Sequence, residues 1–165
     1  MKLDLNRIFD QPGESLLAEH RVDLSSICLW GRCPFTEPVA VKAEVQNRAG
    51  VVTLDLSADF TLSLACDRCL ADFKRRFTPS FVHTLVRELS GKDEDAYLVL
   101  PDGKLDLDEL TAANLVLELP MKILCKQDCK GLCDQCGCNL NETVCGCDHK
   151  VADPRLAALD RFFDE

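Results

Sequence analysis

The sequence has few histidines and no long apolar run. With three histidines in 165 residues, acid–base catalysis would depend on buried carboxylates that a sequence does not identify. The common phosphate-binding, nucleophile-elbow and metalloprotease motifs are absent. No stretch approaches the roughly 20 apolar residues of a membrane span, and residues 1–15 carry acidic and polar side chains where a secretory signal needs apolar ones. We therefore expect a non-enzymatic, cytoplasmic protein.

The composition is otherwise that of a globular protein. Hydrophobic residues make up 47% and charged residues 28%, and the length is that of a single domain. The net charge of −9 disfavours binding of nucleic acid over the protein surface as a whole. Residues 66–90 nevertheless carry a net charge of +2, whereas 91–120 carry −6. Any contact with RNA would therefore be local.

Alternation of apolar and polar residues predicts an antiparallel β-meander with one buried face. A turn containing Gly50 follows the first strand, and a short connection at 57–59 is expected to separate the second strand from the third. The four predicted strands are 39–45, 51–56, 60–66 and 81–89.

A helical period follows a short strand at 97–100. Leu107, Leu110 and Leu117 recur at helical spacing with Ala113 or Asn114 between them, which predicts a helix. Asp106 is the predicted N-cap, with Glu109 three places on, and Pro120 ends the helix. Asp153 and Pro154 indicate a closing helix. The first 38 residues are less regular, with a short helix at 14–19 and a strand at 21–24 as candidates.

The expected fold class is α+β: an antiparallel β-meander with a few helices and a cysteine-rich, zinc-binding C-terminal region. Residues 1–120 would form the α+β domain. Residues 121–165 would form the cysteine-rich region and the closing helix, packed on the same domain.

Cysteine is the abundant feature, with eleven residues in all and seven within 125–147. Eight of them form pairs two to four positions apart, and such pairs are natural half-sites for tetrahedral zinc. Reducing conditions favour metal ligands over disulfides. We therefore predict two structural Zn²⁺ sites. The half-sites are Cys66 and Cys69, Cys125 and Cys129, Cys133 and Cys136, and Cys145 and Cys147.

Spacing alone does not fix which half-sites combine. Cys133/Cys136 and Cys145/Cys147 can close a local knuckle, with Gly137 easing the turn. Cys66/Cys69 must then find a distant partner, which is either Cys125/Cys129 or, in a different arrangement, Cys133/Cys136. Two other interpretations remain open, namely small buried side chains and a thioredoxin-like redox pair. The first of these suits the unpaired cysteines Cys28, Cys33 and Cys138.

Two basic stretches are candidates for RNA contact. Lys74, Arg75 and Arg76 lie between two phenylalanines, an arrangement that suits either phosphates and bases or an amphipathic edge strand. Lys122, Lys126 and Lys130 recur every four residues among the cysteines. Each four-thiolate zinc site carries a charge of about −2, so these lysines could instead offset the sites. Of the lone histidines, His83 is expected on a strand surface and His149 at most as a substitute ligand beside Cys147.

The sequence resembles the YceD family, the large ribosomal RNA subunit accumulation proteins of bacteria and plastids. The resemblance spans about 60–163 and rests on CDRCL after a strand, on ELPMKILCKQDCKGLCDQCGCNLNETVCGC, and on DPRLAALDRF. It implies a role in 23S ribosomal RNA accumulation and large-subunit biogenesis, through binding of the RNA or a pre-ribosomal particle. Family members with fewer C-terminal cysteines keep the counterparts of Cys66 and Cys69 and ligand-like residues near Cys125 and Cys129. The resemblance therefore favours these four as one site. Cys138 departs from the family, where alanine is more usual.

Two alternatives to direct RNA binding stay open. One is an acidic protein–protein adaptor, which would meet a ribosomal protein or assembly factor without touching RNA. The other is a thiol redox switch that releases zinc on oxidation.

Overall fold

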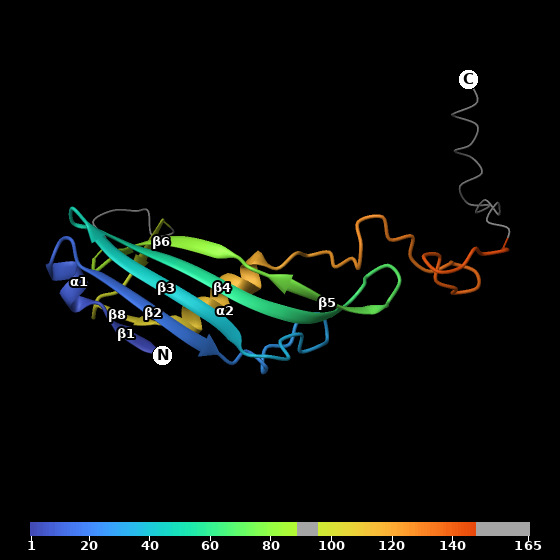
Figure 1. The fold of residues 1–165 in the computed structure, drawn as a ribbon, viewed down its shortest axis with the longest axis horizontal. Coiled ribbons are helices and arrows are strands. Elements are labelled where there is room, and N and C mark those ends of the chain that lie inside the picture. The colour runs from blue at the N-terminus through green and yellow to red at the C-terminus, as the bar shows by residue number, and fades with distance from the viewer. Residues whose placement is uncertain (89–95, 148–165) are drawn as a thin grey trace, which may run out of the picture.

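The computed structural model describes residues 1–88 and 96–147. It is an α+β fold in which a long curved sheet is covered by two helices, as predicted (Figure 1). In chain order the elements are β1 (Lys2–Asp4), α1 (Asn6–Asp10), β2 (Ser15–Val22), β3 (Val39–Arg48), β4 (Val51–Ala65), β5 (Asp72–Phe77), β6 (Ser80–Val86), β7 (Tyr97–Val99), β8 (Lys104–Asp106) and α2 (Leu107–Glu118).

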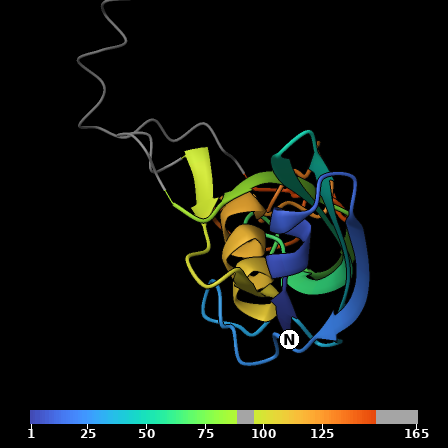
Figure 2. The ribbon, with the colours of Figure 1, turned by 90° about the vertical axis from the view of Figure 1, so that its left-hand side faces the viewer.

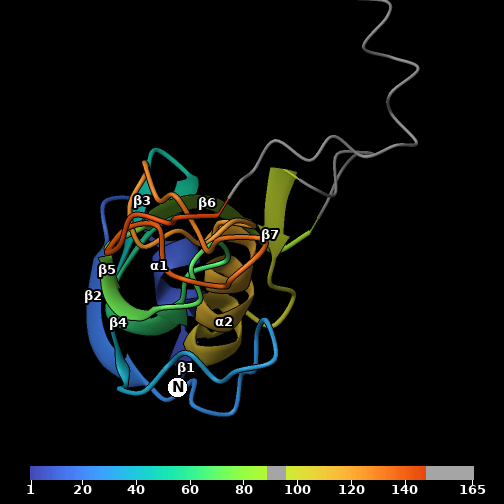
Figure 3. The same ribbon diagram turned by 90° about the vertical axis from the view of Figure 1, so that its right-hand side faces the viewer.

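The main sheet has the strand order β2-β3-β4-β6-β7, and β5 also pairs with β4. The pairs β2/β3, β3/β4, β4/β5 and β4/β6 are antiparallel, so the predicted antiparallel character of the sheet is confirmed. The short strand β7 differs, because it lies parallel to β6. Strands β1 and β8 form a separate two-stranded ribbon. Viewed from the two ends, α1 and α2 lie inside the curve of the main sheet (Figures 2 and 3).

Strand β4 is the central element, and the predicted connection at 57–59 is wrong. The apolar positions keep their phase through this stretch, since Leu56, Ala58 and Phe60 are all buried on one face. Uninterrupted alternation of buried and exposed side chains is typical of a single strand, so the chain does not turn at 57–59. The first part of β4 pairs with β3 and β6, and its last part pairs with β5.

The predicted turn between the first two strands is confirmed. Arg48 pairs with Val51, which leaves Ala49 and Gly50 as a two-residue loop. Both have positive φ, 52° and 90°, the backbone that joins antiparallel strands without splaying them. The buried Asn47 secures this end of the sheet, because its Nδ2 donates to Ile8 O at 2.6 Å and its Oδ1 accepts from Gly50 N.

The helix predicted at 14–19 is wrong, because these residues belong to β2. Ser15 to Val22 pair without interruption with β3, from Gln46 to Val39. The backbone bonds of this ladder outweigh a weak local preference. The N-terminal helix is α1, which contributes Ile8 to the core.

Helix α2 begins and ends where the sequence predicts. The Asp106 carboxylate accepts from the amides of Asp108 and Glu109, and the helix ends at Glu118, before Pro120. Leu107, Thr111 and Leu115 are buried and Leu110 packs against the core, so only part of the leucine repeat faces inward. Leu117 is 84% exposed. Apolar residues lie on more than one side of this helix, so its periodicity did not select one face.

The loop between β2 and β3 corrects a further expectation. Cys28 and Cys33 are exposed and joined by a disulfide, so neither is a small buried side chain. A tight turn brings them together, in which Leu29 pairs with Arg32 around Trp30 and Gly31, both of positive φ. The predicted closing helix and His149 lie outside the described residues. In the part of the chain that is described, no helix is long and apolar enough to cross a membrane.

Candidate metal centres

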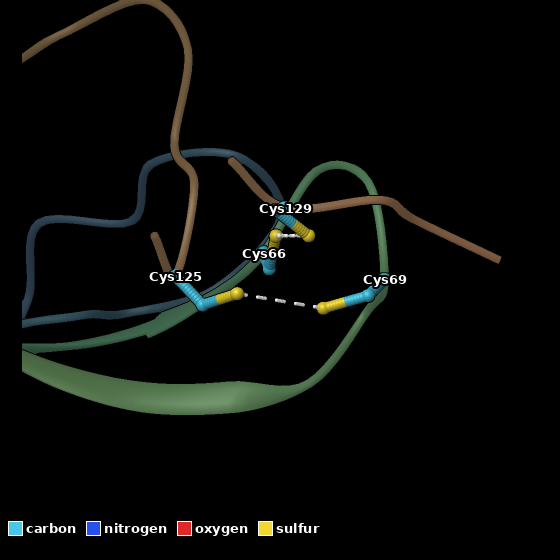
Figure 4. A group of neighbouring side chains, drawn as sticks. All are labelled: Cys66, Cys69, Cys125 and Cys129. Carbon is cyan, nitrogen blue, oxygen red and sulfur yellow. Dashed lines mark hydrogen bonds between the residues drawn. The ribbon is translucent and has the colours of Figure 1, made fainter. Parts of the chain in front are cut away.

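The first cysteine pair lies in the loop that joins β4 to β5. Cys66 follows the end of β4, and its amide donates to Ala71 O at 3.0 Å. Leu70 N donates to Cys66 O, and Leu70 has a φ of 57°. These bonds fold the loop tightly, so that Cys66 and Cys69 both point away from the end of the strand toward one space (Figure 4).

The second pair reaches this loop because the chain after α2 is bonded to it. Asp67 N donates to Ile123 O at 2.8 Å, and Ile123 N donates back to the Asp67 carboxylate at 2.6 Å. On the other side, Arg68 Nη1 donates to Cys129 O at 2.7 Å. These bonds place Cys125 and Cys129 opposite the hairpin.

The four sulfurs have the spacing of a tetrahedral metal site. They all lie within 4.8 Å of one another, with 3.7 Å between Cys66 Sγ and Cys129 Sγ and 3.7 Å between Cys69 Sγ and Cys125 Sγ (Figure 4). Sulfurs at the corners of a zinc tetrahedron with bonds of about 2.3 Å are about 3.8 Å apart. A disulfide would need about 2.0 Å. Three of the four residues are buried, as a closed structural site requires.

The second group forms a local knuckle. The sulfurs of Cys133, Cys136, Cys145 and Cys147 also lie within 4.8 Å of one another. Gly137 N donates to Cys133 O at 2.9 Å, and Gly137 has the positive φ, 71°, that the turn requires. Cys136 is exposed and Cys145 and Cys147 are half-buried, so this group lies nearer to solvent than the first.

Hydrogen bonds lower the pKa of two thiols in each group, Cys66 and Cys129 in the first and Cys136 and Cys145 in the second. Burial raises the pKa of Cys66, but the amides of Cys125, Cys69 and Arg68 outweigh it and lower that pKa to about 6. The amide of Cys147 lowers the pKa of Cys145 to about 6. The thiolate is the form that binds a metal. The chemistry of both donor sets therefore fits a thiophilic cation such as Zn²⁺.

Asn141 links the two groups, and sequence reasoning missed it. It lies in the knuckle of the second group, yet its Nδ2 donates to Cys129 Sγ of the first group at 3.3 Å. Its Oδ1 accepts from Lys130 N at 3.0 Å. Outer groups of this kind orient metal ligands. The sequence offers one signal for Asn141, which is that it lies between the two half-sites of the knuckle.

Of the basic candidates, the four lysines are exposed. Lys74 projects from β5, and Lys122, Lys126 and Lys130 follow α2. The two arginines instead bind within the chain. Arg75 lies over the Phe73 ring and donates to Leu124 O at 2.5 Å, while Arg76 forms an ion pair with Asp59.

The remaining candidates have structural surroundings. Phe73 and Phe77 pack against the core, as an edge strand requires. His83 is half-buried and contacts Asn114 Nδ2 at 2.8 Å, and burial lowers the pKa of its imidazole. Cys138 lies beside the second group, where hydrogen bonding to Cys136 raises the pKa of the Cys138 thiol to about 11.

The fold and these two groups define an α+β protein with two four-cysteine clusters suited to metal ions. The chain belongs to the YceD family, described as large ribosomal RNA subunit accumulation protein YceD, whose family model matches residues 54–163. The description of the family names ribosomal RNA accumulation and no enzymatic reaction.

Two relatives are similar to part of this chain, and one of them carries the family name. An uncharacterized protein of Mycobacterium tuberculosis is 34% identical over 98 residues, which cover 57% of this chain and 47% of the relative. The chloroplastic large ribosomal RNA subunit accumulation protein YCED homolog 1 of Zea mays is 29% identical over 142 residues, 67% of this chain and 48% of the relative. The chain thus spans about half the length of these relatives. No solved structure matches.

Proposed function

We propose that this protein supports accumulation of the 23S ribosomal RNA in the cytoplasm, as a non-enzymatic factor that contacts the RNA or a pre-ribosomal particle directly. Zn²⁺ in both cysteine groups would be structural. The ion in the first group would hold the chain after α2 against the β4–β5 hairpin, using Cys66 and Cys69 on one side and Cys125 and Cys129 on the other.

One observation carries the proposal: the first cysteine group joins the two segments that bear the basic residues. Lys74 lies on β5, and the lysines after α2 lie on the partner segment. The bond from Arg75 to Leu124 O draws the same two segments together. The contact surface would comprise Lys74, Arg75, Arg76, Lys122, Lys126 and Lys130.

If both groups hold Zn²⁺, their negative charge would repel RNA, so RNA binding at this end of the molecule would require nearby positive charge. Two four-thiolate zinc sites add about −4 to a chain already at −9. A phosphate backbone would approach this end of the molecule only where exposed lysines offset that charge. The lysines that recur every four residues along the metal-binding segment would supply this positive charge.

Titration with 23S ribosomal RNA fragments across a salt series tests the proposal. Neutralising Lys122, Lys126 and Lys130 together to glutamine should weaken binding at low salt. It should also reduce the slope of log affinity against log salt by about 2 to 3, because each phosphate contact releases roughly one counterion.

The matched control neutralises three exposed lysines elsewhere, namely Lys2, Lys42 and Lys104. This variant has the same net charge and should keep the slope of the wild type. Equal losses in the two triple variants would show a response to net charge alone, and no binding by the wild type at low salt would refute direct RNA contact.

A further inference from the structure

Helix α2 has an apolar face that nothing in the described part of the chain covers. On the side away from Thr111 and Leu115, it exposes Ala113, Val116 and Leu117, the last two by 39% and 84%. Met121, just beyond the helix, is 96% exposed. A helix that is apolar on both sides is normally buried on both sides.

A groove runs alongside this face. It has a volume of about 550 Å³ and lies between α2 and the strands β7 and β8. Leu98, Leu100 and Leu110 give it an apolar floor, and Ala113 connects it to the exposed side of α2. Figure 3 shows β7 beside α2, with strands β2 and β4 of the same sheet on the other side of the helix. Apolar floor and apolar helix face therefore form one continuous surface.

The surroundings of the groove are acidic. Residues 96–120 have a net charge of −4, and α2 itself has three acidic residues and no basic one. Asp102, Asp106 and Glu109 line the groove, against Lys2 and Lys104. This charge repels phosphate, and it would also oppose a second copy that placed its own α2 against this one.

We propose that α2 and this groove bind a basic amphipathic helix of a partner protein. Its apolar side chains would enter the groove and cover Leu117, and its Lys and Arg side chains would face the acidic rim. An amphipathic helix in an apolar groove is a common mode of recognition, and opposite charges at the rim select the partner. None of these residues belongs to the proposed RNA contact, so the protein would hold a protein partner in addition to RNA.

A designed peptide with the chemistry of the proposed partner tests this. The probe is an 18-residue fluorescent helix with leucine along one face and lysine elsewhere, and the matched probe has glutamate in place of lysine. Full-length protein should bind the lysine probe at least tenfold more tightly than the glutamate probe, as measured by fluorescence anisotropy. Leu117→Glu should weaken this binding about tenfold or more, because one buried leucine contributes that much.

Val51→Glu is the control, since Val51 is also an exposed apolar side chain, 53% exposed, but lies at the β3–β4 turn. It should change binding of the lysine probe less than twofold.

Equal weakening by the two variants, or equal affinity for the two probes, would overturn the proposal. So would self-association in sedimentation that Leu117→Glu abolishes, because a second copy would then occupy the face. RNA titration of Leu117→Glu should match the wild type, which separates this proposal from the RNA contact.

Discussion

At the residue scale, one arginine of the basic stretch on β5 already has an acidic partner within the chain. Arg76 donates from Nε to the Asp59 carboxylate at 2.7 Å, and this contact lowers the pKa of Asp59. Both side chains are largely exposed, so the pair adds little stability. Asp59 instead competes with phosphate for Arg76.

Asp59→Asn should therefore strengthen RNA binding. Without the carboxylate, Arg76 is free to pair with phosphate, and we expect about threefold tighter binding at low salt that disappears at high salt. Filter binding or anisotropy against a 23S fragment measures this. Asp55→Asn makes the same change in charge on the same strand, at an exposed carboxylate without an ion pair among the described residues. Equal gains in both variants would exclude a specific role for Asp59.

Asn141 offers a second test, at the first metal centre. Asn141→Ala removes the hydrogen bond to Cys129 Sγ, and loss of such an outer contact weakens metal affinity about 10- to 100-fold. Competition with a chromogenic chelator should detect one weakened site and one unchanged site. Asn141→Asp keeps an acceptor for Lys130 N but cannot donate to sulfur. Its metal affinity should therefore be no higher than that of the alanine variant. Two unchanged sites would show that the contact has no effect on the metal.

At the scale of elements, β4 connects the core to the metal centre. Its inward side chains form the middle of the core, and its end leads into the hairpin that carries Cys66 and Cys69. Because β5 pairs with β4 from Phe60 to Ala65, the end of the strand that leads to Cys66 is held in the sheet. The second pair depends on the bonds between Asp67 and Ile123.

Helix α2 contains a buried defect that predicts a stabilising substitution. Thr111 is fully buried, and its Oγ1 has no hydrogen-bond partner among the described residues. Thr111→Val replaces this hydroxyl with a methyl group of similar shape, so we expect about 1 kcal/mol of added stability in urea unfolding. Thr61→Val on β4, at a half-buried position, should change stability much less. A loss of stability in Thr111→Val would mean that the hydroxyl has a partner after all.

At the scale of the whole molecule, metal binding would be the link between the sheet and the C-terminal segment. Cys66 and Cys129 are separated by 63 residues in sequence, whereas the second group closes within 15 residues, from Cys133 to Cys147. Loss of metal from the first group should therefore detach the segment, and loss from the second should unfold only the knuckle.

We expect two zinc ions per chain in native mass spectrometry, one of which is lost in Cys66→Ser or Cys129→Ser and the other in Cys145→Ser. Hydrogen exchange should show that residues 121–147 lose protection on chelation while β2, β3 and β4 keep theirs. Cys28→Ser with Cys33→Ser should retain both ions. A single ion, or full protection after chelation, would contradict two independent structural sites.

Most of the secondary structure followed from local patterns. The strand around Val41, the turn at Gly50 and the cap at Asp106 were predictable because period, turn chemistry and capping are properties of neighbouring residues. The continuity of β4 was also present in the alternation from Val52 to Leu64, but it was misinterpreted because Ser57 and Asp59 resemble turn residues.

Other features depended on contacts that a local pattern does not contain. Apolar residues lie on more than one side of helix α2, so only packing against the sheet decided that Leu115 is buried and Leu117 exposed. The residues from Ser15 became a strand because β3 lay beside them. Cys28 met Cys33 because the turn at Trp30 and Gly31 closed between them.

The sequence by itself determined that this protein has four cysteine half-sites, because a half-site is a matter of two residues and a turn. Only the tertiary structure decided how they combine, bringing Cys125 and Cys129 to the β4–β5 hairpin and leaving the knuckle to close on itself. The physical reason is distance along the chain: thiols 56 or 63 residues apart meet only after the sheet and α2 have placed the segments that carry them.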